Sequence, residues 1–175
     1  MEADPAQFAT VVRQHQAMVF SIALHFLRDR TAAEDVAQEV FLQLHQNLAA
    51  IESPAHLTSW LRKVSCQRSI DSSRRRRIRA HRTLDDMPEP ASTPNPADPL
   101  LSGHLHRLVA TLPDRARMLV ILRYQEDLDP ADIARTLDVP VATVKSQLHR
   151  ALAVLRKKIE RVTLEPKMEP KGALQ

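Results

Sequence analysis

Residues 129–150 read DPADIARTLDVPVATVKSQLHR, and this stretch decides the fold. Asp129 followed by Pro130 marks the start of a short helix, and Asp132 favours its N-terminus. Residues 138–140 form a tight turn, after which a second helix begins. A short helix, a turn and a second helix with a polar face together predict a helix-turn-helix, whose second helix enters the major groove of DNA.

The second helix carries polar side chains that suit base edges and phosphates. These are Thr143, Lys145, Ser146, Gln147, His149 and Arg150. The positions expected to face inward are Val141, Val144, Leu148, Ala151, Leu152 and Leu155. An ordinary solvated helix face is the alternative interpretation. The short helix and turn at the correct spacing favour DNA binding.

The composition of the whole chain predicts an all-α protein. It has 175 residues, 43% of them apolar, and only 2 glycines. Alanine, leucine, arginine and glutamine dominate, and these residues favour helices. The net charge of +4 is compatible with a nucleic-acid partner. The N-terminal residues lack a secretory pattern and no run of about 18 apolar residues occurs, so we expect a cytoplasmic protein.

The single cysteine, Cys66, excludes a disulfide within the chain and fits a reducing compartment. It is interpreted as a small buried apolar residue, with a redox sensor or a metal ligand as the alternatives. The histidines show no metal-ligand spacing, and they predict no metal site. We find no phosphate-binding glycine loop, metal pair or nucleophile elbow, so we expect no cofactor, no small-molecule substrate and no catalytic residue.

A proline-bearing segment divides the chain into two small helical domains. Residues 83–103 contain five prolines and predict a flexible linker, which reaches roughly 60 Å when stretched. The first domain is expected at 5–82 and the second at 104–162, followed by a disordered tail at 163–175. Expected helices cover about 5–27, 31–47, 57–79 and 101–110, with further starts after Thr111, Asp129 and Pro140. The second of these helices begins with Thr31 as N-cap and Glu34 three residues later, a capping box.

A basic run at 62–82 is the second functional signal. It contains nine lysines and arginines and one acidic residue, Asp71. Such an excess on a helix and its exit predicts phosphate contact with a strong salt dependence. A solubilising segment or an acidic protein partner is the alternative.

Both halves resemble the extracytoplasmic-function (ECF) sigma factors of bacterial RNA polymerase. Residues 35–41, DVAQEVF, are similar to their region 2.2, and residues 60–77 are similar to regions 2.3 and 2.4. In the second half, several short motifs match the region 4 pattern: Leu112-Pro113 with Arg117, Leu122-Arg123-Tyr124, Asp132-Ile133-Ala134, and residues 140–146 with His149-Arg150-Ala151. The resemblance covers about residues 5–160. It extends to the absence of a middle domain, which is typical of this group.

The resemblance implies a promoter-specificity subunit that has no enzymatic activity. Core polymerase would be bound through its β′ clamp helices by Asp35, Gln38 and Glu39, and through its β flap by the second domain. A loop at 53–58 would receive a flipped base of the −10 promoter element. Contacts to −10 DNA are implied for Ser53, His56, Arg62, Lys63, Gln67, Arg68, Asp71, Arg74 and Arg75. Contacts to the −35 element are implied for Arg117 and the polar residues of the last helix.

The resemblance further implies control by an anti-sigma factor, which could hold the protein at the membrane. The alternative function is a helix-turn-helix regulator that binds DNA without stoichiometric polymerase. Trp60 is interpreted as a core residue, with stacking on an unpaired base as the alternative.

Overall fold

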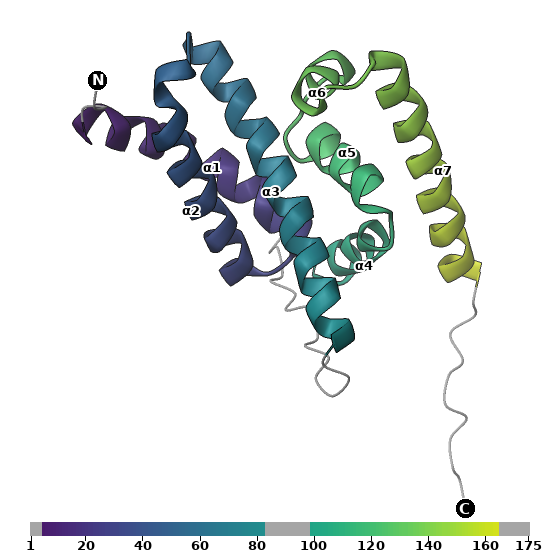
Figure 1. Cartoon of the computed structure of the whole chain (residues 1–175). Helices are drawn as coiled ribbons and strands as arrows, with labels where there is room; N and C mark the ends of the chain where they lie inside the picture. Colours follow the sequence, from purple (N-terminus) through teal and green to yellow (C-terminus); the bar gives the residue numbers. More distant parts are fainter. Residues whose placement is uncertain (1–4, 83–98, 165–175) are drawn as a thin grey trace, which may run out of the picture.

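Helices account for all the regular structure in the part of the chain that the structure describes (Figure 1). The computed structural model describes residues 5–82 and 99–164, and this part of the chain contains no strand. Its helices are α1 (Pro5–Leu27), α2 (Arg30–Asn47), the 3₁₀ turn η1 (Leu48–Ala50), α3 (Pro54–Arg82), α4 (Pro99–Ala110), α5 (Asp114–Tyr124), α6 (Pro130–Leu137) and α7 (Val141–Leu164). The all-α expectation is confirmed.

The N-terminal half, α1 to α3, packs around an apolar core that each helix supplies from one face. The buried side chains recur three or four residues apart, the spacing that places them on one side of a helix. They are Val19, Ala23, Ala33, Val36, Val40, Leu44, Leu57, Leu61 and Val64. Trp60 is half-buried against this core.

The start of α2 differs from the sequence prediction. Asp29, not Thr31, is the N-cap: its carboxylate accepts a hydrogen bond from the Ala32 N–H at 2.9 Å. Glu34 does not complete a capping box, because it pairs with Arg30 at 2.9 Å. Both candidate caps are good capping residues, and Asp29 is additionally held by an ion pair with Arg76 on α3 at 2.7 Å. The residue that caps α2 is thus the one that also pairs with a helix distant in sequence.

The C-terminal half, α4 to α7, is built around α5. Met118, Leu119, Val120, Ile121 and Leu122 are all buried, so α5 is covered on every side at this level. The other helices of this half surround it, with α6 and α7 forming the expected helix-turn-helix (Figure 1). A helix that is apolar all round belongs inside a larger core.

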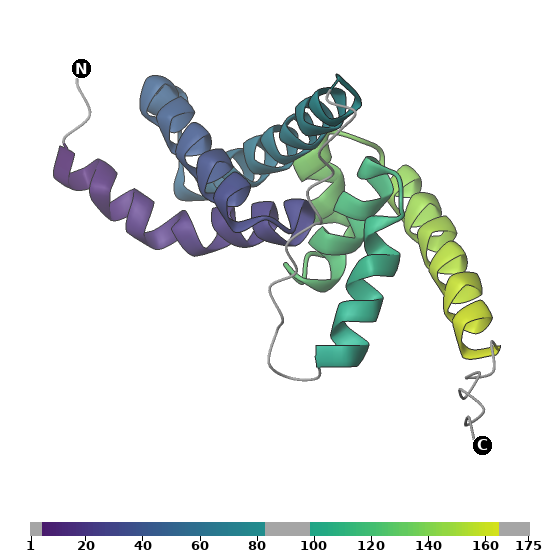
Figure 2. The same ribbon diagram turned by 90° about the horizontal axis from the view of Figure 1, so that it is seen from below.

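The two halves share one continuous apolar cluster. Ile22 and Phe26 of α1 and Cys66 of α3 are 0% exposed and belong to the same cluster as the buried residues of α5, α6 and α7. Both α3 and the end of α1 lie directly against the C-terminal half (Figures 1 and 2). Full burial of a side chain such as Ile22 or Phe26 contributes roughly 1.5–3 kcal/mol. We call this contact region the junction.

Polar contacts also cross the junction. Ser21 on α1 donates a hydrogen bond to Glu126 at 2.7 Å. Lys63 on α3 pairs with Asp138 after α6 at 3.6 Å. The sequence predicts two separate domains, and it predicts none of these contacts between them.

The expected linker and tail lie mostly outside the described residues. Of the segment 83–103, residues 99–103 belong to α4, which begins at Pro99, and residues 83–98 are not described. Of the tail 163–175, residues 163 and 164 belong to α7. No helix in the described part of the chain is both long and apolar enough to cross a membrane.

Candidate nucleic-acid interface

The helix-turn-helix forms where the sequence places it. The Asp129 carboxylate caps α6 by accepting a hydrogen bond from the Asp132 N–H at 2.7 Å, and Pro130 follows in the first turn. The α6 helix ends at Asp138, whose φ of 56° and ψ of 53° are left-handed. The Pro140 carbonyl then accepts from the Thr143 and Val144 N–H groups at 2.9 and 3.2 Å, which starts α7.

The start of α7 presents the expected DNA-reading side chains to solvent. Exposed side chains are Lys145, Ser146, His149 and Arg150, and half-buried ones are Thr143 and Gln147. We call these six residues the recognition face. The opposite side is buried through Val144, Leu148, Ala151 and Leu155.

Two residues expected to face inward on α7 are partly exposed instead. Val141 is 39% exposed because it is the first residue of the helix. Leu152 is 38% exposed because it borders a cavity of about 290 Å³ between α4, α5 and α7.

The segment expected to receive a flipped base is helical. Pro54 starts α3, so residues 54–58 form its first turn rather than a loop. The Ser53 hydroxyl accepts a hydrogen bond from the His56 N–H at 3.1 Å, and the His56 Nδ1 accepts from the Glu52 N–H at 3.4 Å. Ser53 and His56 are both exposed. Their hydrogen bonds also stabilise the start of α3.

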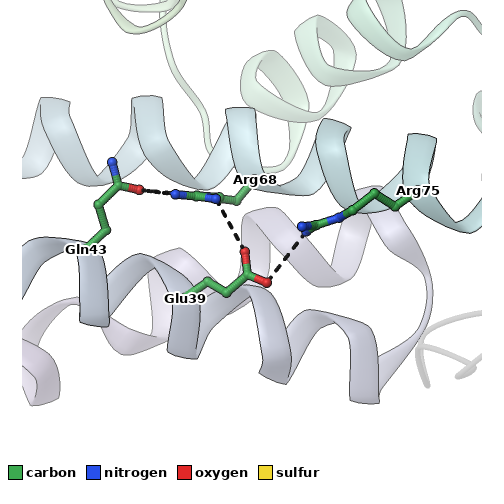
Figure 3. Close-up of polar contacts among 4 residues, drawn as sticks. All are labelled: Glu39, Gln43, Arg68 and Arg75. Carbon is green, nitrogen blue, oxygen red and sulfur yellow. Dashed lines mark hydrogen bonds and ion pairs between the residues drawn. The ribbon is translucent and has the colours of Figure 1, made fainter.

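Further along α3, two of the expected DNA contacts are held by α2 (Figure 3). The Gln43 Oε1 accepts hydrogen bonds from Arg68 Nε at 3.2 Å and from Arg68 Nη2 at 2.8 Å. The Glu39 carboxylate lies 3.7 Å from Arg68 Nη1 and 3.5 Å from Arg75 Nη2. Glu39, expected to contact polymerase, thus pairs with two residues expected to contact DNA.

Successive arginines at the end of α3 have different partners. Arg75 pairs with Glu39 on α2, Arg76 with Asp29 at the α1–α2 corner, and Arg77 with Asp114 on α5. Because consecutive residues of a helix are about 100° apart around its axis, neighbouring side chains reach different elements. Arg74 is exposed on the same helix.

The remaining α3 candidates differ in exposure. Gln67 and Asp71 are exposed and thus accessible to DNA. Arg62 is half-buried, and its Nε has no hydrogen-bond partner among the described residues. Lys63 is half-buried and engaged with Asp138.

Arg117 lies at the junction and not beside the recognition face. Its guanidinium pairs with Asp114 at 2.7 Å and stacks over the Phe26 ring, 4.2 Å from the ring centroid. Its side chain is only 14% exposed. In this arrangement Arg117 joins α5 to α1, and its implied contact with −35 DNA would require the junction to change.

The expected polymerase face lies on α2. Asp35 and Gln38 are exposed. Gln38 borders an open groove of about 950 Å³ between α1 and α2, whose apolar lining includes Phe20, Phe41 and Leu42. Leu42 is 65% exposed beside this groove, and a contiguous apolar surface of this kind is typical of a binding site.

Cys66 is inaccessible in this structure. Burial raises the pKa of its thiol from 9.0 to about 12, and the negative charge of Glu126 adds to the effect. A buried neutral thiol fits the interpretation as a packing residue. Within the described residues, no group of three or more His, Cys, Asp and Glu side chains is placed to hold a metal ion.

The residues that hold the arginines were not predicted from the sequence. Gln43 lies four residues after Glu39, so both occupy one face of α2, and this spacing is the signal that could have found it. Asp29 is the N-cap of α2, and Asp114 is an acidic residue in the first turn of α5, and both roles involve only residues near in sequence. Their pairing with Arg76 and Arg77 depends on packing alone.

Comparison with known families assigns both halves. The family "Sigma-70 region 2" matches residues 11–79, and "Sigma-70, region 4" matches residues 103–155. The region 2 match favours a sigma factor over a plain helix-turn-helix regulator.

Individual relatives extend over most of the chain. The ECF RNA polymerase sigma factor SigF of Caulobacter vibrioides is 32% identical over 141 residues, 78% of each chain. The ECF RNA polymerase sigma factor SigW of Bacillus subtilis is 27% identical over 173 residues, 89% of this chain and 90% of the relative.

A solved structure has a similar fold. It is the sigma factor RpoE of Bartonella quintana, in complex with the anti-sigma factor NepR, and the TM-score is 0.73. The similarity covers 88% of this chain and 97% of that chain at 18% identity.

Proposed function

The chain belongs to the extracytoplasmic-function sigma factors of bacterial RNA polymerase, and on this premise we propose how its surfaces divide the work of promoter recognition. The recognition face of α7 reads the −35 element in the major groove. The exposed polar side of α3 binds the −10 element and its separated strand. The α2 face with Asp35 and Gln38 binds the β′ clamp helices, and the apolar side of the C-terminal half binds the β flap.

One observation carries this proposal: two separate basic surfaces, on different halves of the chain, face solvent. Lys145 and Arg150 are exposed on α7, and Arg74 and Arg75 are exposed on α3. Basic side chains on a helix suit phosphates, and those of a recognition helix also suit guanine edges. A single-site regulator would need only the first surface.

The halves must separate for both elements to be bound at once. Positions −10 and −35 are roughly 85 Å apart on straight duplex at about 3.4 Å per base pair. In the structure, however, α6 lies directly against α3, and Lys63 pairs with Asp138. We therefore propose that the described arrangement is the resting state, and that promoter binding opens the junction.

We propose that an anti-sigma factor controls the protein through these same surfaces. The proposed partner is a protein that binds the apolar groove between α1 and α2 or stabilises the junction, so that the polymerase face or the DNA faces are withheld. The sigma factor acts in the cytoplasm, where polymerase and promoter DNA meet, and an anti-sigma factor that is itself membrane-bound would hold it at the membrane.

Run-off transcription with purified core polymerase tests the proposal. Addition of the chain should give promoter-dependent transcripts on genomic templates. Replacement of Lys145 or Arg150 by alanine should weaken promoter binding by about 1–3 kcal/mol if that side chain reads a base. Arg161→Ala is the matched control, because Arg161 lies roughly 24 Å along the same helix from Lys145. Absence of any promoter-dependent transcript would refute the proposal.

A further inference from the structure

Gln43 lies outside the surfaces assigned above, yet it makes the most specific contact to one of them. Its Oε1 accepts two hydrogen bonds from Arg68, through Nε at 3.2 Å and Nη2 at 2.8 Å (Figure 3). Two hydrogen bonds to a planar guanidinium fix both its position and its rotation. Gln43 thus determines where the Arg68 side chain points.

The contact follows from the register of two packed helices. Glu39 and Gln43 are four residues apart on α2, and Arg68 and Arg75 are seven residues apart on α3. Both spacings keep each pair on one face of its helix. The facing pairs therefore form a ladder in which Gln43 and Glu39 hold Arg68, and Glu39 also holds Arg75.

The ladder leaves the arginines free to bind a further anion. One carboxylate faces two guanidinium groups, so the cluster keeps a positive charge. The Gln43 hydrogen bonds use Nε and one Nη2 hydrogen of Arg68, and a guanidinium has five N–H donors. Arg68 and Arg75 also remain 37% and 50% exposed, so a phosphate can reach them.

An exposed arginine samples many rotamers, and ordering it on binding opposes affinity. An arginine already held by a neutral amide avoids most of this loss and keeps its full charge for the phosphate. A carboxylate at the same place would neutralise part of the charge, which explains why an amide at position 43 suits this role.

We infer that Gln43 is a positioning residue for −10 DNA, which with Glu39 holds Arg68 in the orientation that binds the strand. The inference rests on the proposed role of Arg68 in −10 binding. In this proposal α2 has two functions. Its side with Asp35 and Gln38 binds polymerase, and its side with Gln43 orients the arginines of α3.

The test uses holoenzyme reconstituted at saturating core polymerase. The probe is a fork-junction DNA, with the −10 strand unpaired, from the promoter that gives the strongest run-off transcript. Gln43→Leu removes the acceptor at similar size, and we expect it to weaken probe binding about threefold to tenfold. Affinity for core polymerase and the melting temperature of the free chain should stay unchanged.

Two companion variants separate positioning from a general effect. Gln46→Leu is the matched control, because Gln46 is exposed on the same helix and the change is chemically identical. It should leave probe binding unchanged. Gln43→Glu keeps an acceptor for Arg68 but adds a negative charge beside it, so it should restore only part of the affinity that Gln43→Leu loses. A purely structural role would predict no such recovery.

A double-mutant cycle decides the outcome. Arg68→Ala should weaken probe binding, and adding Gln43→Leu to it should cause no further loss, because the held side chain is gone. If Arg68→Ala weakens binding but Gln43→Leu behaves like Gln46→Leu, positioning is wrong and the proposed function stands. If Arg68→Ala has no effect, the DNA role of Arg68 fails, and the inference fails with it.

Discussion

At the scale of single residues, environment decides which chemistry a side chain offers. Cys66 is fully buried where α3 meets the C-terminal half, and burial together with the charge of Glu126 raises its thiol pKa to about 12. The thiolate is the reactive form of cysteine, so this thiol is inert while the junction is closed. Arg117 is a second case, because it pairs with Asp114 at the junction and its side chain is largely withdrawn from solvent.

The raised pKa of Cys66 predicts a loss of stability in alkali. A raised pKa favours the protonated thiol in the folded chain, so its contribution is complete below pH 9.0 and is lost as the pH rises towards 12. The unfolding free energy of the wild type should therefore fall more steeply between pH 9 and 11 than that of Cys66→Ala. Urea titrations at several pH values measure the difference. Parallel curves for the two proteins would show that the thiol does not contribute.

At the scale of elements, helix starts are fixed by short polar contacts. The Ala32 N–H, then the charge of Arg76, lowers the pKa of the Asp29 carboxyl, while partial burial opposes them. Asp129 caps α6 in the same manner, by accepting from the Asp132 N–H three residues later. The start of α2 is therefore linked to α3, whereas the start of α6 depends on local sequence.

Substitution of Asp29 should separate capping from charge. Asp29→Ala should lower the unfolding free energy by about 1 kcal/mol at neutral pH, because the α2 cap is lost. Asp29→Asn keeps an acceptor for the Ala32 N–H and should lose less. A lowered pKa means that the carboxylate contributes above pH 3.8 and less as the pH falls, so wild type and Asp29→Asn should converge in acid. Denaturant titrations check this, and an unchanged gap at pH 3 would contradict it.

At the scale of the whole molecule, the junction contains both attraction and repulsion. Apolar burial of Ile22 and Phe26 holds the halves together. Arg28, at the end of α1, is opposed by Arg107 and Arg117, and its pKa is lowered by burial and by these two charges. Like charges across the contact reduce its strength, which suits a junction that opens when a partner binds the separated form.

Cys66 should report the opening directly. It is the single cysteine of the chain, so alkylation at this position monitors the junction alone. We expect iodoacetamide to modify it slowly in the free chain and about tenfold faster or more once core polymerase and promoter DNA are added. Mass spectrometry of the peptide that contains Cys66 measures the rate. Equal protection in both states would show that the halves stay together during promoter binding.

Local signals in the sequence predicted most helices, and contacts between distant residues explain the failures. Asp129-Pro130 and the turn at 138–140 place α6 and α7 correctly, because capping and turn formation involve neighbouring residues. The shared core was missed because Ile22 and Phe26 continue the apolar stripe of α1 that also supplies Val19 and Ala23. Periodicity shows that such positions are buried but not which element covers them.

The candidate site was predictable to a similar extent. The recognition face follows from the spacing of Val144 and Leu148, which fixes the solvent side of α7. The placement of Arg117 could not follow from sequence, because it depends on Phe26, which lies 91 positions earlier in the chain. Gln43 was missed because a glutamine on a polar helix face has many ordinary explanations.

The three consecutive arginines near the end of α3 have a consequence for genetics. Arg75, Arg76 and Arg77 are identical residues, yet each forms an ion pair with a different part of the fold. A mutation at the first removes a contact with the second helix, one at the next a contact with the corner before it, and one at the third a contact with the opposite half. Three alleles that look interchangeable on paper therefore remove three different contacts, and a genetic screen should score them separately.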